Sequence, residues 1–479
     1  MIHAGPRSLT VAALLFLTGC RAGPNYSRPQ VNVPPSFRGS QTANQRASFA
    51  DLQWWHVFQD ATLKDLVKTA LENNYDLGVA ITRVQQARQA AAEAWSQYLP
   101  TVDYITTLTY GHNQFTGSPS SNLPGAQGFF LGIVRASWEA DVWGRIRRIN
   151  EGARAQYVES EDLRRGVMLT LVTDVSQAYF ELLGLKLQLE IARQAAQSYA
   201  ATFNLFNDRL TEGLGNALQT SRAQAALSAA DAGIPELERQ IGLKENQISV
   251  LLGKNPAPIA TKINLLEDAI PLHIPAGLPS ALLERRPDIL AAAQRVRHAN
   301  AQIGVARADY FPKIGLTTFF GKLSTPLADL ASANTNAWSL GSNAVGPIFT
   351  AGALNARRRQ AVAFWEQTRL QYLQTVLNAF RDVSDALISR EKLEGIRAEQ
   401  IREVQSAKEA VGLARTRYVE GLSSYIEVLE AQQALFPAEF ALAGTEISRR
   451  IAVVQLYKAL GGGWNLSDAQ WMSGNPSIP

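Results

Sequence analysis

Two regions of the chain alternate apolar and polar residues with a period of two, which indicates strands with one apolar face. In the first region, the apolar face of 101–110 carries Val102, Tyr104, Thr106, Leu108 and Tyr110. After a loop rich in glycine and proline, a return strand carries on one face Val134, Ala136, Trp138, Ala140 and Val142. The second region repeats the pattern with Ile314, Leu316, Thr318 and Phe320, then Trp338, Leu340 and Ala344. The alternation therefore predicts two strand pairs.

Helical patterns fill most of the remaining sequence. A helix is predicted from Asp76 to Tyr98, where Pro100 ends it. The long proline-free stretch that follows carries a heptad-like seam at Val172, Val175, Tyr179, Leu182 and Leu189. A helix from Arg147 to Thr211 would be on the order of 100 Å long. We expect Gly213 and Gly421 to be turn or hinge points at which two such helices reverse direction.

The two halves of the chain repeat each other. Gly144 and Gly352 are 208 residues apart, as are Gly213 and Gly421, and the segments around them match. Leu99-Pro100 and Phe311-Pro312 are 212 residues apart, so an insertion of four lies in the loop-like part between. Such a repeat predicts duplicated helix–strand–strand–long-helix halves. The expected segments are 1–19 (signal peptide), 20–60 (N-terminal segment), 61–255 (first repeat), 256–275 (linker), 276–464 (second repeat) and 465–479 (tail).

The number of strands bears on how the chain could span a membrane. No segment after Cys20 has enough consecutive apolar residues to cross a bilayer as a helix, so a spanning part must be a barrel. The smallest transmembrane barrels have about 8 strands, and one chain offers only four. Copies of the chain must therefore pool their strands. By strand count alone, both a dimer and a trimer would suffice.

The N-terminus reads as a bacterial lipoprotein signal. A short apolar run from Leu9 to Leu17 is too short to span a bilayer and fits a signal peptide. It ends in Leu17-Thr18-Gly19-Cys20, which looks like a lipobox. Cys20 is the only cysteine, so it cannot form an intramolecular disulfide. We expect diacylglycerol and an N-acyl chain on Cys20, and Arg21 in place of Asp favours the outer membrane.

Composition excludes several other functions. The net charge of +4 is small and basic residues are interleaved with acidic ones, which argues against a nucleic-acid partner. The five histidines are scattered without ligand spacing, so we expect no metal site. Gly461-Gly462-Gly463 precedes Trp464 rather than a Lys-Ser pair, and it reads as a helix stop, not a phosphate loop. The chain is therefore predicted to be neither an enzyme nor a cofactor protein, apart from its lipid.

A series of short motifs carries a family resemblance. In order, they are Gly23-Pro24-Asn25-Tyr26, Trp54-Trp55 with Phe58 and Asp60, Asp141-Val142-Trp143-Gly144-Arg145-Ile146, Arg285-Arg286-Pro287-Asp288-Ile289, Tyr310-Phe311-Pro312, Gly346-Pro347-Ile348-Phe349 and Leu460-Gly461-Gly462-Gly463-Trp464. Together with the duplication, they resemble the TolC/OprM family of outer-membrane efflux proteins, and within it the NodT-type lipoproteins. The resemblance implies a mainly α fold with a transmembrane β part. It also implies a homotrimer with a 12-stranded β-barrel, an α-helical barrel tunnel and a mixed equatorial collar.

The same resemblance implies a function. The chain would be the outer-membrane channel of a tripartite RND-type efflux system, a passive duct for drugs or other small toxic compounds. It would lie in the outer membrane of a Gram-negative bacterium, extend into the periplasm, and bind a periplasmic adaptor and an inner-membrane RND pump. Two alternatives remain at this point: a type I secretion or autotransport duct for proteins, and a structural lipoprotein without transport. The lipobox and the Gly-Pro-Asn-Tyr motif favour the efflux branch.

The resemblance also implies a periplasmic gate at Tyr418, Glu427 and Glu430. The two glutamates are three apart and share one helix face, just after the turn at Gly421. In three copies they would form an acidic ring, where better-known relatives have Asp. A basic position of one such relative is Ser423 here, so that ion-pair lock is expected to be incomplete. The alternative is an ordinary solvated helix face, and the equivalent first-half positions are Gln219 and Arg222.

Overall fold

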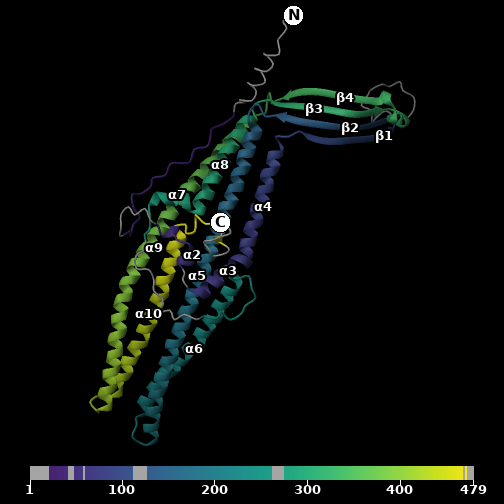
Figure 1. The fold of residues 1–479 in the computed structure, drawn as a ribbon. Helices are drawn as coiled ribbons and strands as arrows, with labels where there is room; N and C mark the ends of the chain where they lie inside the picture. Colours follow the sequence, from purple (N-terminus) through teal and green to yellow (C-terminus); the bar gives the residue numbers. More distant parts are fainter. Residues whose placement is uncertain are drawn as a thin grey trace. The chain divides into compact units, whose positions relative to one another are not determined.

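The computed structural model describes residues 21–40, 48–57, 60–111, 127–261, 275–467 and 470–471. They form two compact units, and each unit draws on both halves of the sequence (Figure 1). Unit 1 comprises residues 1–30, 83–161 and 291–373, and unit 2 comprises 31–82, 162–290 and 374–479. Cys20, Phe58 and most of the C-terminal tail lie outside the described residues.

The order of elements repeats along the chain. The first half contains α2 (Trp54–Val57), α3 (Ala61–Asn73), α4 (Tyr75–Ser96), β1 (Thr101–Gly111), β2 (Gln127–Ala140), α5 (Arg145–Thr211) and α6 (Ala217–Leu251). The second half contains α7 (Leu282–Arg285), α8 (Pro287–Ala308), β3 (Lys313–Ser324), β4 (Asn336–Val345), α9 (Ala353–Val419) and α10 (Tyr425–Ala459). Helices α5 and α9 both have 67 residues, and α6 and α10 both have 35. The predicted mainly α fold with duplicated halves is confirmed.

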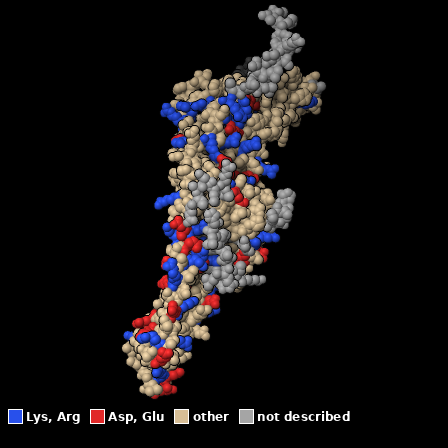
Figure 2. All heavy atoms as spheres, turned by 60° about the vertical axis from the view of Figure 1, so that its left-hand side comes forward, with Lys and Arg blue, Asp and Glu red and all other residues tan. Residues whose placement is uncertain are grey.

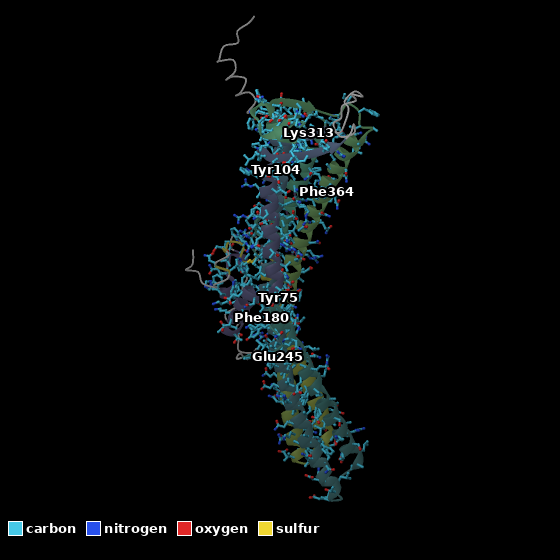
Figure 3. All side chains as sticks on the ribbon, turned by 90° about the vertical axis from the view of Figure 1, so that its right-hand side faces the viewer. Tyr75, Tyr104, Phe180, Glu245, Lys313 and Phe364 are labelled. Carbon is cyan, nitrogen blue, oxygen red and sulfur yellow. The ribbon has the colours of Figure 1, made fainter. Side chains whose placement is uncertain are left out.

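Unit 1 contains one antiparallel sheet in the order β1-β2-β3-β4. One row across it pairs Tyr104 with Val134, Val134 with Phe320, and Phe320 with Trp338. All four side chains are exposed, and Tyr104, labelled in Figure 3, is 81% exposed. The alternation read from the sequence thus places a continuous apolar face on the sheet, open to the surroundings. Among the described residues, no helix combines the length and the apolar character needed to cross a bilayer.

Strand β2 differs most from its prediction. The alternation placed its start near Val134, whereas it begins at Gln127 and pairs with the whole of β1. Its first half contains glycines and apolar residues on both faces, so the period of two is masked there. Pro100 follows the end of α4, as predicted, but α6 runs through Pro235 and α10 through Pro437. Packing against neighbouring helices therefore outweighs the hydrogen bond that each proline removes.

The Gly-Pro-Asn-Tyr motif is anchored in unit 1 by one buried arginine. Arg148, which is 1% exposed, donates to the carbonyl oxygens of Ala22 at 3.1 Å and Gly23 at 3.2 Å, and to Asn25 Oδ1 at 3.2 Å. Glu151 balances its charge at 2.7 Å. Gly23 has φ of 89°, and a Cβ there would lie 2.6 Å from the Cα of Gly304. The segment next to Cys20 is therefore fixed to unit 1, and the motif requires glycine.

Two further family motifs form a joint at the base of the sheet. Asp141 accepts hydrogen bonds from the backbone N–H groups of Ile146 and Arg147, both at 2.9 Å, and so caps the start of α5. Trp143 stacks on Phe311 with ring centroids 4.6 Å apart, and its indole N–H donates to the Pro312 carbonyl at 2.8 Å. The end of the first strand pair is thereby attached to the start of the second.

Unit 2 is held together by the heptad-like seam of α5 and by charged joints. Val172, Val175, Tyr179 and Leu182 are fully buried, as the spacing predicts, whereas Leu189, the last residue of the predicted seam, is only partly buried. Tyr179 donates its hydroxyl hydrogen bond to Asp60, whose carboxylate also caps α3. Arg285 pairs with Asp51 at 3.0 Å and lies over the Trp464 ring at 5.0 Å. These contacts bring the Arg-Arg-Pro-Asp and Gly-Gly-Gly-Trp motifs together in unit 2.

Candidate functional site at the helical tips

The predicted site residues lie at the ends of two helical hairpins in unit 2. Gly213 follows α5 with φ of 78°, and Gly421 follows α9 with φ of 72°. Leu422 N–H donates to the Arg417 carbonyl at 2.8 Å and Gly421 N–H donates to Tyr418 at 3.0 Å, and the α5 end has the same two bonds. This is the Schellman pattern, which needs a left-handed residue after the helix. Both glycines therefore occupy turns that reverse the chain.

An aromatic cluster joins the two hairpins near their tips. The Tyr425 ring contacts Phe206 at 4.7 Å and Tyr418 at 4.8 Å between centroids, both edge-to-face. The Tyr425 hydroxyl shares a hydrogen bond of 2.5 Å with Thr202 Oγ1. Burial raises the pKa of Tyr425, so the phenol stays neutral and keeps this bond. Tyr418 is half-buried against this cluster rather than free in solvent.

Two arginines that the sequence analysis did not single out contact the predicted gate residues. Arg209 of α5 donates a hydrogen bond to the Tyr418 hydroxyl. Arg417 pairs with Glu427 across the α9–α10 turn at 3.3 Å. Arg209 and Arg417 are 208 residues apart, so they occupy the same place in the two repeats. That repeat was the available signal, since it places an equivalent arginine near the end of the first helix of each hairpin.

The glutamates have different surroundings within one chain. Glu427 is exposed and paired with Arg417, whereas Glu430 is exposed and has no ion-pair partner in the described part of the chain. The Ser423 hydroxyl is buried without a hydrogen-bond partner among the described residues, so it makes no lock of its own. The contact of Arg417 with Glu427 is solvent-exposed, and such pairs contribute about 0–1 kcal/mol. An arrangement of this kind separates easily.

The turns themselves present apolar side chains. Leu214 and Leu422 occupy equivalent positions after the two glycines, and both are exposed, as is Val419. On the face shown in Figure 2, acidic and basic side chains are mixed near the hairpin ends. A leucine at each turn, next to charged neighbours, offers a small apolar contact to a partner that approaches the tips.

Comparison with known proteins gives one consistent result. The family described as outer membrane efflux protein matches residues 66–254 and 278–462. Cation efflux system protein CusC of Escherichia coli O6:H1 is 34% identical over 95% of this chain and 98% of its own. Probable outer membrane lipoprotein SilC of Salmonella typhimurium is 32% identical over 95% and 98%. The open-state structure of the Neisseria gonorrhoeae MtrE outer membrane channel superposes with a TM-score of 0.84, at 28% identity, over 93% of this chain and 99% of that one. The chain belongs to the outer membrane efflux protein family.

Proposed function

We propose that this protein is the outer-membrane channel of a tripartite RND-type efflux system, working as a passive homotrimeric duct. The observation that carries the proposal is the sheet of unit 1, which exposes one apolar face and has unpaired edges at β1 and β4. In lipid each unpaired backbone group costs several kcal/mol, so the edges must be covered. Three copies supply twelve strands and close the sheet on itself. The long hairpins of three copies then line one conduit.

The partners follow from the tips and from the relatives. The exposed leucines at both turns suit a periplasmic adaptor, which would connect the duct to an inner-membrane RND pump. CusC is named as part of a cation efflux system, and this supports efflux rather than protein secretion. We propose drugs or other small toxic compounds as the exported class. The energy for export would come from the pump, because the chain would serve only as the exit path.

The repeats give the proposed division of the chain. Residues 61–255 and 276–464 are the two repeats, joined by 256–275, with 20–60 as the lipidated segment and 465–479 as a tail. The equal lengths of the equivalent helices in the two halves support this division. Gly213 and Gly421 would be the hinges about which the hairpin ends move.

The gate proposal assigns the constriction to Tyr418, Glu427 and Glu430. In three copies the glutamates would approach one another, and like charges held close together favour binding of a cation. Arg417 would hold Glu427 in the closed form, and Arg209 would hold Tyr418. Because each of these exposed contacts is weak, an adaptor that offers better contacts at the tips could open them.

Charge removal at the gate is expected to change ion selectivity. Glu427→Gln with Glu430→Gln should abolish cation selectivity and block by divalent ions in single-channel recordings of the purified trimer. The charge-matched control is Glu399→Gln with Glu403→Gln, two exposed glutamates on α9, which should leave both properties unchanged. If the gate variant keeps the wild-type selectivity and block, the glutamates line no constriction and form an ordinary solvated face.

Lipidation of Cys20 is a separate expectation. SilC is named as a probable lipoprotein, and Arg148 fixes the segment that follows Cys20. Mass spectrometry of the mature N-terminus should therefore show an acylated Cys20, and Cys20→Ser should abolish the added mass. Some trimer should still reach the membrane in this variant, since the sheet anchors independently. An intact Met1 or an unmodified Cys20 would refute the lipoprotein assignment.

A further inference from the structure

The two edge strands of the sheet, β1 and β4, both carry exposed apolar side chains, and these bear on the contact between copies. Beyond the last residue of β4, the chain continues as Gly346-Pro347-Ile348-Phe349, in which Ile348 is 103% exposed and Phe349 is 87% exposed. At the other edge, Val102 and Tyr104 of β1 are also exposed. Large apolar side chains at both edges, next to unpaired backbone, call for a covering strand.

The strand pairings within one chain show how the first hairpin, β1–β2, corresponds to the second, β3–β4. Thr101 of β1 pairs with Ser137 of β2, and Lys313 of β3 pairs with Val345 of β4. Thr101 and Lys313 are 212 residues apart, and Ser137 and Val345 are 208 apart, as the two sequence offsets require. The difference of four lies in the connections between paired strands. The duplication therefore preserves the register of each hairpin.

Applying these offsets to the β2–β3 contact gives a contact that a single chain cannot make. Ala136 of β2 pairs with Thr318 of β3. The residue equivalent to Ala136 is Ala344, and the residue equivalent to Thr318 is Thr106. We propose that β4 of one copy pairs antiparallel with β1 of the next, with Ala344 opposite Thr106. This rests on the proposed trimer and adds to it the register of the seam between copies.

The proposed register satisfies the side chains at both edges. It keeps the apolar residues of β1 and β4 on the same face, whereas a slip by one residue would turn one set to the other face. At two positions it sets a large residue opposite a small one, with Tyr104 facing Gly346 and Leu108 facing Ser342. In addition, Trp138 to Ala140 of β2 pair with β3 alone, beyond the start of β1. The equivalent residues 346–348 would lie beside β1 of the next copy, where Ile348 would cover Val102, while Pro347 has no N–H to donate to the ladder.

The register also closes with a constant stagger. Within the chain, Thr101 is opposite Ser137, which is opposite Thr317, which is opposite Gly341. In the proposed seam, Gly341 is opposite Thr109 of the next copy. Thr317 is equivalent to residue 105 of the first half, which lies four residues after Thr101, and Thr109 lies four residues after that. Each hairpin therefore shifts the register by four residues. Closure fixes the total stagger of a sheet, and in this register every hairpin contributes equally to it.

Four positions on the polar face allow a matched crosslinking test. The register places Thr107 opposite Asn343 and Thr109 opposite Gly341 of the next copy. Cysteine pairs 107/343 and 109/341 should form disulfides under mild oxidation, giving covalent dimers and trimers on a non-reducing gel. The pairs 107/341 and 109/343 use the same four residues in registers shifted by two, and should give at least tenfold less product. A Cβ at Gly341 meets no atom within 4 Å, so the substitution fits.

The crosslinking experiment distinguishes an error in the β4–β1 register from an error in the proposed trimer. Within one chain, β1 and β4 are three strand spacings apart, about 14 Å, which is beyond disulfide reach, so every product joins two chains. Single-cysteine variants measure any background from Cys20, the only native cysteine. Preferential crosslinking of 107/341 or 109/343, or no crosslinking in a protein whose native mass is that of a trimer, would overturn the register alone. A monomeric native mass of the wild type would overturn the proposed assembly as well.

Discussion

Phe320→Arg is expected to prevent assembly in the membrane, whereas Thr317→Arg is expected to be tolerated. Phe320 lies on the exposed apolar face of central strand β3, between Val134 and Trp338. A charge on the lipid face near the midplane costs about 2–4 kcal/mol, and a homotrimer carries it three times. Thr317 lies on the opposite face of the same strand, between Ser137 and Gly341, where water would solvate the charge.

The measurement is the yield of heat-dissociable oligomer in isolated outer membranes, with total expression as reference. Phe320→Arg should lower that yield at least tenfold, and Thr317→Arg should stay within twofold of wild type. Equal tolerance at both positions would mean that this face does not meet lipid. Equal loss at both positions would mean that the sheet is buried on both faces.

Glu446→Gln is expected to destabilise the helical part of unit 2 by about 3–5 kcal/mol, because it removes the anion from a buried charge cluster. Glu446 of α10 is 3% exposed and contacts Arg397 of α9, Arg449 at 2.8 Å and Arg450 at 2.9 Å. Arg449 also holds Glu394 of α9 at 2.7 Å. Without the Glu446 charge, Arg449 and Arg450 remain buried with too little compensation.

The pH dependence has a definite sign. Burial raises the pKa of Glu446, but its contacts with Arg397, Arg449 and Arg450 outweigh burial and hold the pKa below the ordinary value of 4.5. A carboxylate whose pKa is lower in the folded than in the unfolded state stabilises the fold fully above its unfolded-state pKa. This contribution is lost as the pH falls through its folded-state pKa. The gap between wild type and Glu446→Gln should therefore be complete above about pH 4.5 and shrink in stronger acid.

Loss of helix in urea, followed by circular dichroism in one detergent, measures this difference. The matched control is Glu399→Gln, which removes an exposed partner of Arg402 on α9 and should change stability by less than about 1 kcal/mol. If Glu446→Gln behaves like this control at neutral pH, the cluster does not stabilise the fold.

The regular parts of this structure could be predicted because they follow from periodicity. The alternation around Tyr104 and Phe320 gave the strands and their apolar face, and the seam around Tyr179 gave α5. The repeat around Gly213 and Gly421 gave two equivalent turns. These signals are local, or they repeat at a fixed distance, so a single sequence contains them.

The remaining features depend on contacts between distant residues, which no local pattern encodes. Arg148 reads as one of many arginines on a helix, yet it binds the segment at Ala22 to Asn25. The early start of β2 follows from pairing with β1, not from its own alternation. At the candidate gate, the glutamates were predicted, but the contacts of Arg417 with Glu427 and Arg209 with Tyr418 required the fold.

Conductance of the purified wild-type trimer in planar bilayers tests most directly whether the protein is a duct. We expect discrete and reproducible current steps with no added energy source, because an open duct passes ions passively. Trimer that is inserted in the bilayer yet gives no current above that of lipid alone would contradict this expectation.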